Sequence, residues 1–169
     1  KLTGRGYFAL WKKPSNLVKV ILNAPNINFR LAAMHDAKLL LEWRNDEETR
    51  ARSLSPDLVS MASHLDWLRA SLNDPKRKLW IGEIDQNPIG TVRFDLLNNN
   101  AEMSWTLAPA LRNKGLGKKF LEAAVELFSG DLVAKIKTDN FASLKIAQSV
   151  GFQKMSESDG VSMWRLKKN

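Results

Sequence analysis

The stretch from Leu107 to Phe120 constrains the fold and function of this chain more than any other. A run typical of a strand, Ala101–Leu107, leads into it, and an amphipathic run typical of a helix leads out of it. Between them Pro109 delays the helix, while Gly115 and Gly117 lack the Cβ atoms that would keep a ligand away from the backbone. A helix that begins in this way offers free N–H groups and the positive end of its dipole to an anion. We therefore predict a diphosphate-binding loop.

The residues that we expect at the anion are Arg112, Asn113, Lys114, Gly115, Leu116, Gly117 and Lys118. A glycine-containing turn with solvated lysines is the alternative interpretation. The loop is not a nucleotide P-loop, because Gly117 lacks a glycine five positions earlier and Lys118 is followed by Lys119 instead of a hydroxyl residue. It is not a dinucleotide fingerprint either, because Phe120 stands where the third glycine belongs.

Composition predicts one globular domain with a cytoplasmic location. The chain has 169 residues, of which 44% are apolar and 26% charged. No apolar run approaches the length of about 20 residues that a membrane span needs. Cysteine is absent, which excludes disulfides, thiolate metal sites and cysteine nucleophiles. We expect no metal and no membrane partner.

The net charge of +8 raises the question of nucleic-acid binding. The positive residues are scattered, with no Lys/Arg run longer than three, and zinc-finger spacings and glycine-rich aromatic RNA motifs are missing. A ligand with several phosphate charges explains part of the excess. We therefore expect no nucleic-acid partner.

The pattern Arg112-x-x-Gly115-x-Gly117 before an apolar helix resembles the acyl-CoA-binding motif of the GCN5-related N-acetyltransferases. Lys137–Phe152 is similar to the following segment of that family, and Phe29–Asp46 is similar to its opening strand and helix. The resemblance implies acetyl-CoA as co-substrate and a primary amine as acceptor. It also implies an α/β fold in which a mixed, mostly antiparallel central sheet carries helices on both faces.

The resemblance covers about residues 28–167, and we expect residues 28–169 to form the N-acetyltransferase domain. Residues 1–27 are expected to be an N-terminal extension or linker, with a candidate strand at Leu17–Leu22 and a possible role in a homodimer. Apolar spacing and turn signals predict the other elements. They are helices over Met34–Glu42, Ser63–Leu72 and Phe141–Val150, a hairpin of Lys78–Ile84 with Ile89–Leu96, parallel strands Ala101–Leu107 and Leu132–Lys137, and a final hairpin of Phe152–Ser156 with Val161–Leu166. We expect His64 to be an ordinary surface or capping residue.

By resemblance, the two parallel strands diverge near Leu107 and the pantetheine arm lies between them like an added strand. A free backbone N–H near Leu107 would then bind the developing oxyanion. Asn140 heads the next helix, where its amide would bond the pantetheine arm or would only cap the helix.

Acetyl transfer also needs a base and an acid. Glu102, on the strand that leads to the loop, is the candidate base, although it could equally be the polar face of a strand. Glu83 and Asp95 are weaker candidates. Many family members place a tyrosine acid where this chain has Ala147, so we name Ser143 and Asn140 as substitutes.

The acceptor side is predicted from Trp43, Arg44, Asn45 and Arg50. A charged helix surface is the plain interpretation of this run. The run resembles acetyltransferases of nonulosonic (pseudaminic-type) sugar biosynthesis and, less closely, ribosomal-protein N-terminal acetyltransferases. We therefore expect a small-molecule amine, specifically an amino sugar on a nucleotide whose diphosphate pairs with Arg44 and Arg50. A protein N-terminal amine is one alternative, and a non-catalytic acyl-CoA-binding regulatory module is another.

Overall fold

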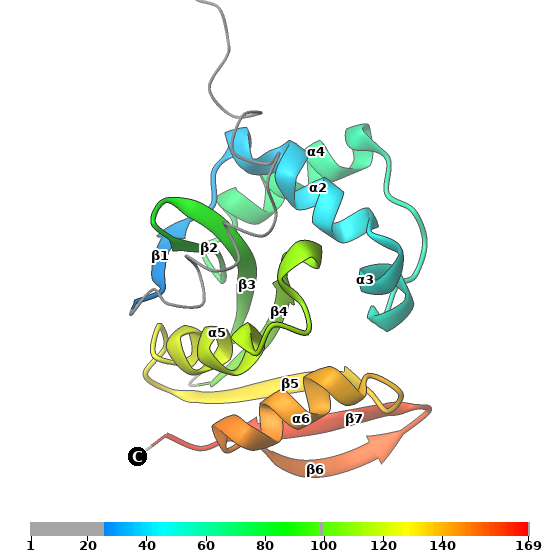
Figure 1. Cartoon of the computed structure of the whole chain (residues 1–169), viewed down its shortest axis with the longest axis vertical. Helices are drawn as coiled ribbons and strands as arrows, with labels where there is room; N and C mark the ends of the chain where they lie inside the picture. The colour runs from blue at the N-terminus through cyan, green and yellow to red at the C-terminus, as the bar shows by residue number, and fades with distance from the viewer. Residues whose placement is uncertain (1–25, 99, 169) are drawn as a thin grey trace, which may run out of the picture.

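The core of the protein is a seven-stranded sheet, seen here in a computed structural model that describes residues 26–98 and 100–168 (Figure 1). Its strands are β1 (Asn28–Leu31), β2 (Arg77–Ile84), β3 (Asn87–Leu97), β4 (Asn100–Leu107), β5 (Asp131–Lys137), β6 (Gln153–Ser158) and β7 (Val161–Leu166). Their order across the sheet is β1-β2-β3-β4-β5-β7-β6. Only β4 and β5 are parallel among these neighbours, which confirms the predicted mixed, mostly antiparallel sheet.

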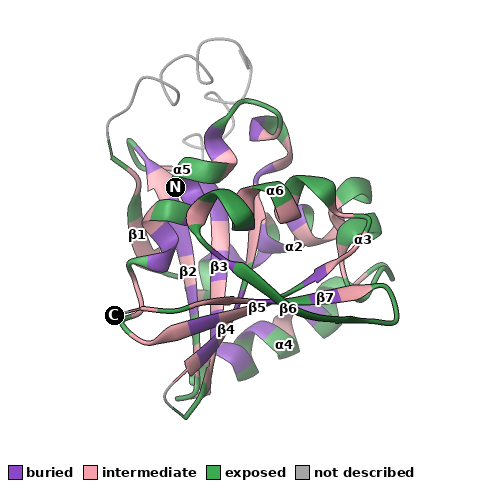
Figure 2. Ribbon diagram, turned by 90° about the horizontal axis from the view of Figure 1, so that it is seen from below, coloured by how far each residue is buried: buried purple, intermediate pink, exposed green. Residues whose placement is uncertain are grey.

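Helices cover both faces of the sheet. The helical segments are η2 (Met34–Asp36), α2 (Ala37–Asn45), α3 (Glu47–Arg52), α4 (Met61–Asn73), η3 (Pro109–Leu111), α5 (Leu116–Val125) and α6 (Phe141–Val150). Residues of α2 and α4 share one apolar cluster with β2, whereas α5 and α6 share a second cluster with β4, β5 and β7. The outermost strand, β6, is exposed along its whole length (Figure 2).

A close contact fixes the position of α5 on the sheet. Gly82 and Gly90 are paired across β2 and β3, and the ring of Phe120 from α5 lies directly over them. A Cβ atom at Gly82 would come within 2.5 Å of that ring. The missing side chains therefore let α5 approach the sheet, and this places the start of α5 beside the end of β4.

The parallel pair β4–β5 is joined over a short length only. Its register runs from Asn100 opposite Asp131 to Glu102 opposite Val133, and no further pair follows. Because β5 continues to Lys137 and β4 to Leu107, the two strands diverge over the second half of each. The predicted divergence is thus present in the fold, and it begins closer to Glu102 than to Leu107.

One local expectation was wrong, and another falls outside the described residues. The wrong expectation is the one for His64, whereas the helix α3 (Glu47–Arg52), which begins with Asp46 as its N-cap, agrees with the plain interpretation of its run as a charged helix surface. His64 is 3% exposed and stacks on Trp67, because the α4 face that carries it turns towards α2. The candidate strand at Leu17–Leu22 lies outside the described residues.

No helix in 26–98 or 100–168 combines the length and the apolarity that crossing a bilayer would need.

Candidate active site

The loop between β4 and α5 contains two residues in the left-handed region of backbone conformation. Asn113 has φ 57° and Gly115 has φ 73°. Asparagine and glycine are the residues that tolerate this conformation best, because their side chains are short or absent. The two turns bring the chain from the 3-10 helix η3 into the first turn of α5 within a few residues.

The N-terminus of α5 is not capped by a side chain. Its N-cap residue is Gly115, whereas α3, α4 and α6 begin at Asp46, Ser60 and Asn140, each of which accepts a hydrogen bond from a first-turn N–H. The N–H groups at the start of α5 therefore have no side-chain acceptor. Together with the helix dipole they form a site that suits an anion.

Positive charge surrounds this N-terminus. Lys114, Lys118 and Lys119 are all exposed, and Lys118 also lies 3.5 Å from Glu122 one turn further along α5. Leu116, by contrast, is buried in the core and so holds the first turn of the helix in place. Of the predicted loop residues, the lysines and the backbone thus face solvent, while Leu116 holds the loop in place.

The two glycines of the loop have different surroundings. Among the described residues, no atom other than those of Gly115 and its chain neighbours lies within 4 Å of the position that a Cβ atom of Gly115 would occupy, so the space in front of this residue is open. A Cβ atom at Gly117 would lie 2.6 Å from Cδ1 of Ile146 on α6. Gly115 therefore leaves room for a ligand, whereas the missing side chain of Gly117 lets α5 and α6 pack closely.

Arg112 does not point into free space. Its Nη1 donates to Asp46 Oδ2 at 2.6 Å, and its Nη2 donates to the hydroxyl of Thr49. Burial alone would raise the pKa of Asp46, but the hydrogen bonds from Arg112 and Thr49 outweigh it and hold that pKa below its ordinary value. The arginine of the predicted phosphate motif thus joins this loop to α3.

Glu102 lies on the face of β4 that α5 does not cover. Its carboxylate is 2.9 Å from Nζ of Lys135 on β5, and its side chain is 27% exposed. The weaker candidates are more heavily engaged, since Glu83 bonds Arg30 at 2.8 Å and Asp95 pairs with two arginines. Glu102 is therefore the carboxylate that sits beside the divergence of β4 and β5 and is reached by solvent.

Three of the four residues predicted for the acceptor come together around the loop 53–60. Arg44 donates to one loop carbonyl at 2.6 Å, and Arg50 donates to another at 3.1 Å. Asn45 makes a pair of bonds to one loop residue, donating at 2.8 Å and accepting at 2.9 Å. These side chains hold the loop between α3 and α4, a role that no local sequence signal indicated.

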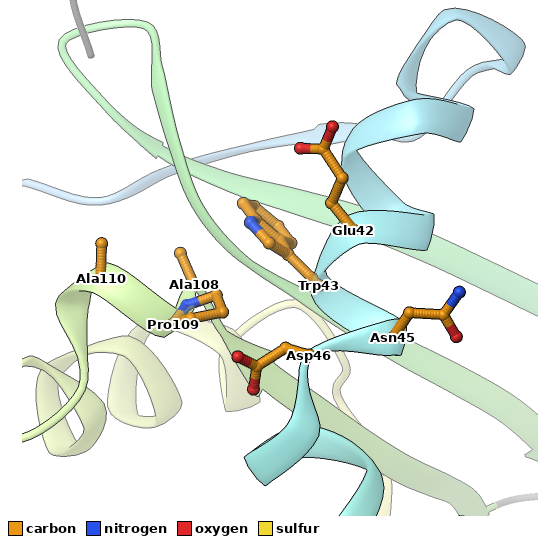
Figure 3. Close-up of a pocket in the computed structure, with 7 residues that line it drawn as sticks. All are labelled: Glu42, Trp43, Asn45, Asp46, Ala108, Pro109 and Ala110. Carbon is orange, nitrogen blue, oxygen red and sulfur yellow. The ribbon is translucent and has the colours of Figure 1, made fainter. Parts of the chain in front are cut away.

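Trp43, the fourth of these residues, lines a cleft of about 380 Å³ between α2 and the end of β4 (Figure 3). The cleft is lined by Glu42, Trp43, Asn45, Asp46, Ala108, Pro109 and Ala110. In the close-up the indole lies between the Glu42 side chain and Ala108, and the Asp46 carboxylate points towards Pro109. The cleft thus combines an apolar wall with two carboxylates.

Comparison with known families decides the assignment. The family model described as an acetyltransferase (GNAT) domain matches residues 26–153. The chain belongs to the GNAT acetyltransferase family. It is therefore an acetyl-CoA-dependent N-acetyltransferase, and the interpretation as a non-catalytic module is set aside.

Solved structures of other acetyltransferases share the GNAT fold. The spermidine N-acetyltransferase of Vibrio cholerae, in complex with CoA and spermine, is 15% identical with a TM-score of 0.75, over 84% of this chain and 95% of that one. An aminoglycoside acetyltransferase in complex with coenzyme A is 17% identical with a TM-score of 0.70, over 84% and 95%. RimL, a ribosomal L7/L12 alpha-N-protein acetyltransferase in complex with coenzyme A, is 15% identical with a TM-score of 0.73, over 86% and 96%. No curated protein sequence matches the chain significantly.

The described residues of this GNAT domain fit acetyl-CoA. The uncapped start of α5 suits a pyrophosphate, and the open space at Gly115 lets a phosphate approach the backbone. The edge of β4 that faces β5 has no partner strand beyond Glu102 among the described residues, so it can pair with an extended ligand. Bound acetyl-CoA supplies an activated acetyl thioester at this edge.

On the β5 side of the GNAT cleft, Asn140 is the N-cap of α6. Its side-chain oxygen accepts from the N–H of Ser143 at 3.2 Å, which leaves the amide NH₂ to donate elsewhere. Ala147 is fully buried, so the position of the family's tyrosine lies in the apolar core here. Because the chain has one tyrosine, Tyr7, and it lies outside the described residues, the described part of the site contains no phenolic acid.

Proposed function

We propose that the enzyme acetylates the primary amine of a small molecule that also carries negative charge, such as an amino sugar linked to a nucleotide. The observation that carries this proposal is the open face of the sheet beside the divergence of β4 and β5. Lys135 and Lys137 of β5 reach this face with side chains that are 44% and 31% exposed. They would attract a diphosphate and repel a polycation, at distances where salt screens little of the interaction.

The cleft beside Trp43 supports a sugar as the group that carries the amine. Its volume of about 380 Å³ is near the lower end of the range for small-molecule sites. An indole wall suits a ring with apolar and polar faces, and the carboxylates of Glu42 and Asp46 would attract an ammonium group. Arg44 and Arg50, which bond the loop 53–60, would meet a diphosphate only if that loop moved.

In this proposal Glu102 is the general base. It would take the proton from the acceptor ammonium directly or through one water, and Lys135 would pair with the carboxylate until the acceptor arrives. A backbone N–H near Leu107 would stabilise the oxyanion, and the loop from Arg112 to Lys118 would hold the pyrophosphate. Asn140 or Ser143, at the start of α6, would lie towards the departing thiolate.

Thiol release from acetyl-CoA tests the acceptor. We would compare a nucleotide-linked amino sugar, the same amino sugar without its nucleotide, spermidine, an aminoglycoside and a peptide with a free N-terminus. We expect the nucleotide-linked sugar to exceed the free sugar at least about tenfold in kcat/KM, the effect of about 1.4 kcal/mol. Preference for the peptide would favour N-terminal acetylation of proteins, and preference for the polycations would overturn the proposal.

Light scattering of the full chain would measure its oligomeric state and so test the predicted homodimer.

A further inference from the structure

Helix α3 connects the two sides of the cofactor cleft. Its first residues bond the loop that follows β4, and its last residues bond the turn that follows β5, although these segments are far apart in the sequence. Figure 1 shows α3 beside the space where the chain leaves β4. The helix therefore spans the ends of the two strands that diverge.

The first turn of α3 is held by Arg112. The Asp46 carboxylate accepts from the Thr49 N–H at 2.9 Å as the N-cap of α3, and the same oxygen accepts from Arg112 Nη1 at 2.6 Å. Arg112 also lies 3.4 Å from Glu48. A single guanidinium, fixed in the phosphate loop, thus bonds three residues at the start of α3.

The last turn of α3 is held from the other strand. Arg52 Nη1 donates to the carbonyl of Asp139 at 2.6 Å, in the turn that precedes α6. Nζ of Lys137, the last residue of β5, donates to the carbonyl of Ala51 at 3.0 Å. Both bonds run between charged donors and backbone carbonyls, which makes them stronger than neutral hydrogen bonds.

These polar contacts decide the position of α3, because the helix contributes nothing to the core. None of its residues is buried. The strand pairing that would hold the two sides together also stops at Glu102 and Val133. A short helix without buried side chains would be free to open if its end contacts were lost.

We propose that α3 is a clasp across the ends of β4 and β5 that holds the cofactor cleft at its working width, with Arg52 and Asp46 as positioning residues. The inference rests on the proposed place of acetyl-CoA between these strands. Neither residue needs to touch the cofactor. Each acts by keeping one end of α3 fastened to one side of the cleft.

The proposal is testable because a clasp and simple electrostatics predict opposite effects on coenzyme A binding for one of two variants. Arg52→Met removes a positive charge near the cleft, and Asp46→Asn removes a negative one while keeping a good N-cap residue. Electrostatics alone would weaken the binding of coenzyme A in the first variant and strengthen it in the second. A clasp predicts weaker binding in both, by about tenfold each, the lower end of the effect of one charge-assisted hydrogen bond.

The measurement is titration calorimetry of the full chain with coenzyme A, with the melting temperature of each variant. The clasp also predicts that the double variant binds little worse than either single variant, because a clasp released at one end is already open. Arg69→Met is the control, since Arg69 is an exposed arginine paired only with Asp66 on the same helix. Arg52→Lys, which can still donate to the carbonyl, should recover most of the affinity.

The outcomes are distinct. Tighter binding by Asp46→Asn, unchanged binding by Arg52→Met, or fully additive effects would overturn the clasp while leaving the cofactor assignment intact. Absence of coenzyme A binding by the unmodified protein would overturn both.

Discussion

The two strands that diverge, β4 and β5, each lead into a helix on the same face of the sheet, but the two helices begin in different ways. Helix α5 begins at Gly115 with no side-chain cap and with exposed lysines around it. Helix α6 begins at Asn140, whose side chain already bonds a first-turn N–H. One N-terminus is thus available to an anion, whereas the other is satisfied within the protein. This difference favours the β4 side as the proposed place of the pyrophosphate.

The largest expected effect is on kcat, and it compares Glu102 on β4 with its partner Lys135 on β5. Glu102→Gln should lower kcat by about 100-fold, because a positioned base contributes at least that much, and should spare the affinity for coenzyme A. Lys135→Met, which removes a positive charge proposed to attract the acceptor but leaves the base in place, should change kcat only a few-fold. Steady-state thiol release measures both. Full activity of Glu102→Gln would remove this residue as the base.

A second comparison uses two glycines with the same backbone conformation. Gly115 and Gly160 both have φ 73°, so replacing either by Ala should cost about 1 kcal/mol of stability. Only Gly115→Ala places a methyl group in the open space before α5, and we expect it to weaken coenzyme A binding about tenfold, the loss of one or two hydrogen bonds. Titration calorimetry of both variants with coenzyme A measures the two affinities. Equal affinities would show that this space holds no phosphate.

The contact between α5 and α6 gives a third test. Gly117→Ala should destabilise the fold by about 1–2 kcal/mol, because the new methyl group would overlap the end of Ile146. Ile146→Val removes the overlapping Cδ1 atom, so the double variant should recover stability in urea unfolding. Affinity for coenzyme A should recover with it. A stable double variant that still failed to bind would show that the bare backbone at Gly117 serves the ligand as well.

The smallest effect concerns the capped helix. Asn140→Ala should cost about 1 kcal/mol of stability, whereas Asn140→Ser keeps a capping oxygen and should cost much less. The serine variant lacks the amide donor. If that donor bonds the pantetheine arm, its affinity for coenzyme A should fall about threefold to fivefold. Wild-type affinity in Asn140→Ser would leave Asn140 as a helix cap alone.

Most of the fold could be predicted from the periodicity of apolar residues and from the residues typical of turns. The helix Phe141–Val150 and the strand Val161–Leu166 have the predicted bounds, because each is framed by clear signals such as Asn140, Gly151 and the Asp159–Gly160 turn. No bounds could be predicted for α3, because its six residues carry no apolar periodicity and none is buried. Its helical form depends on Asp46 and on contacts from distant parts of the chain.

The candidate phosphate loop could be predicted from the sequence because its backbone properties are local. Left-handed turns, missing Cβ atoms and an uncapped helix start all follow from residues that are close together in the chain. What only the tertiary structure decided is which charged side chains remain available. Arg112 bonds Asp46 across 66 residues, and Arg52 bonds Asp139 across 87, so their partners could not be deduced from spacing. Long side chains bond to the groups that folding brings within about 3 Å, and the packing of the whole domain determines which groups those are.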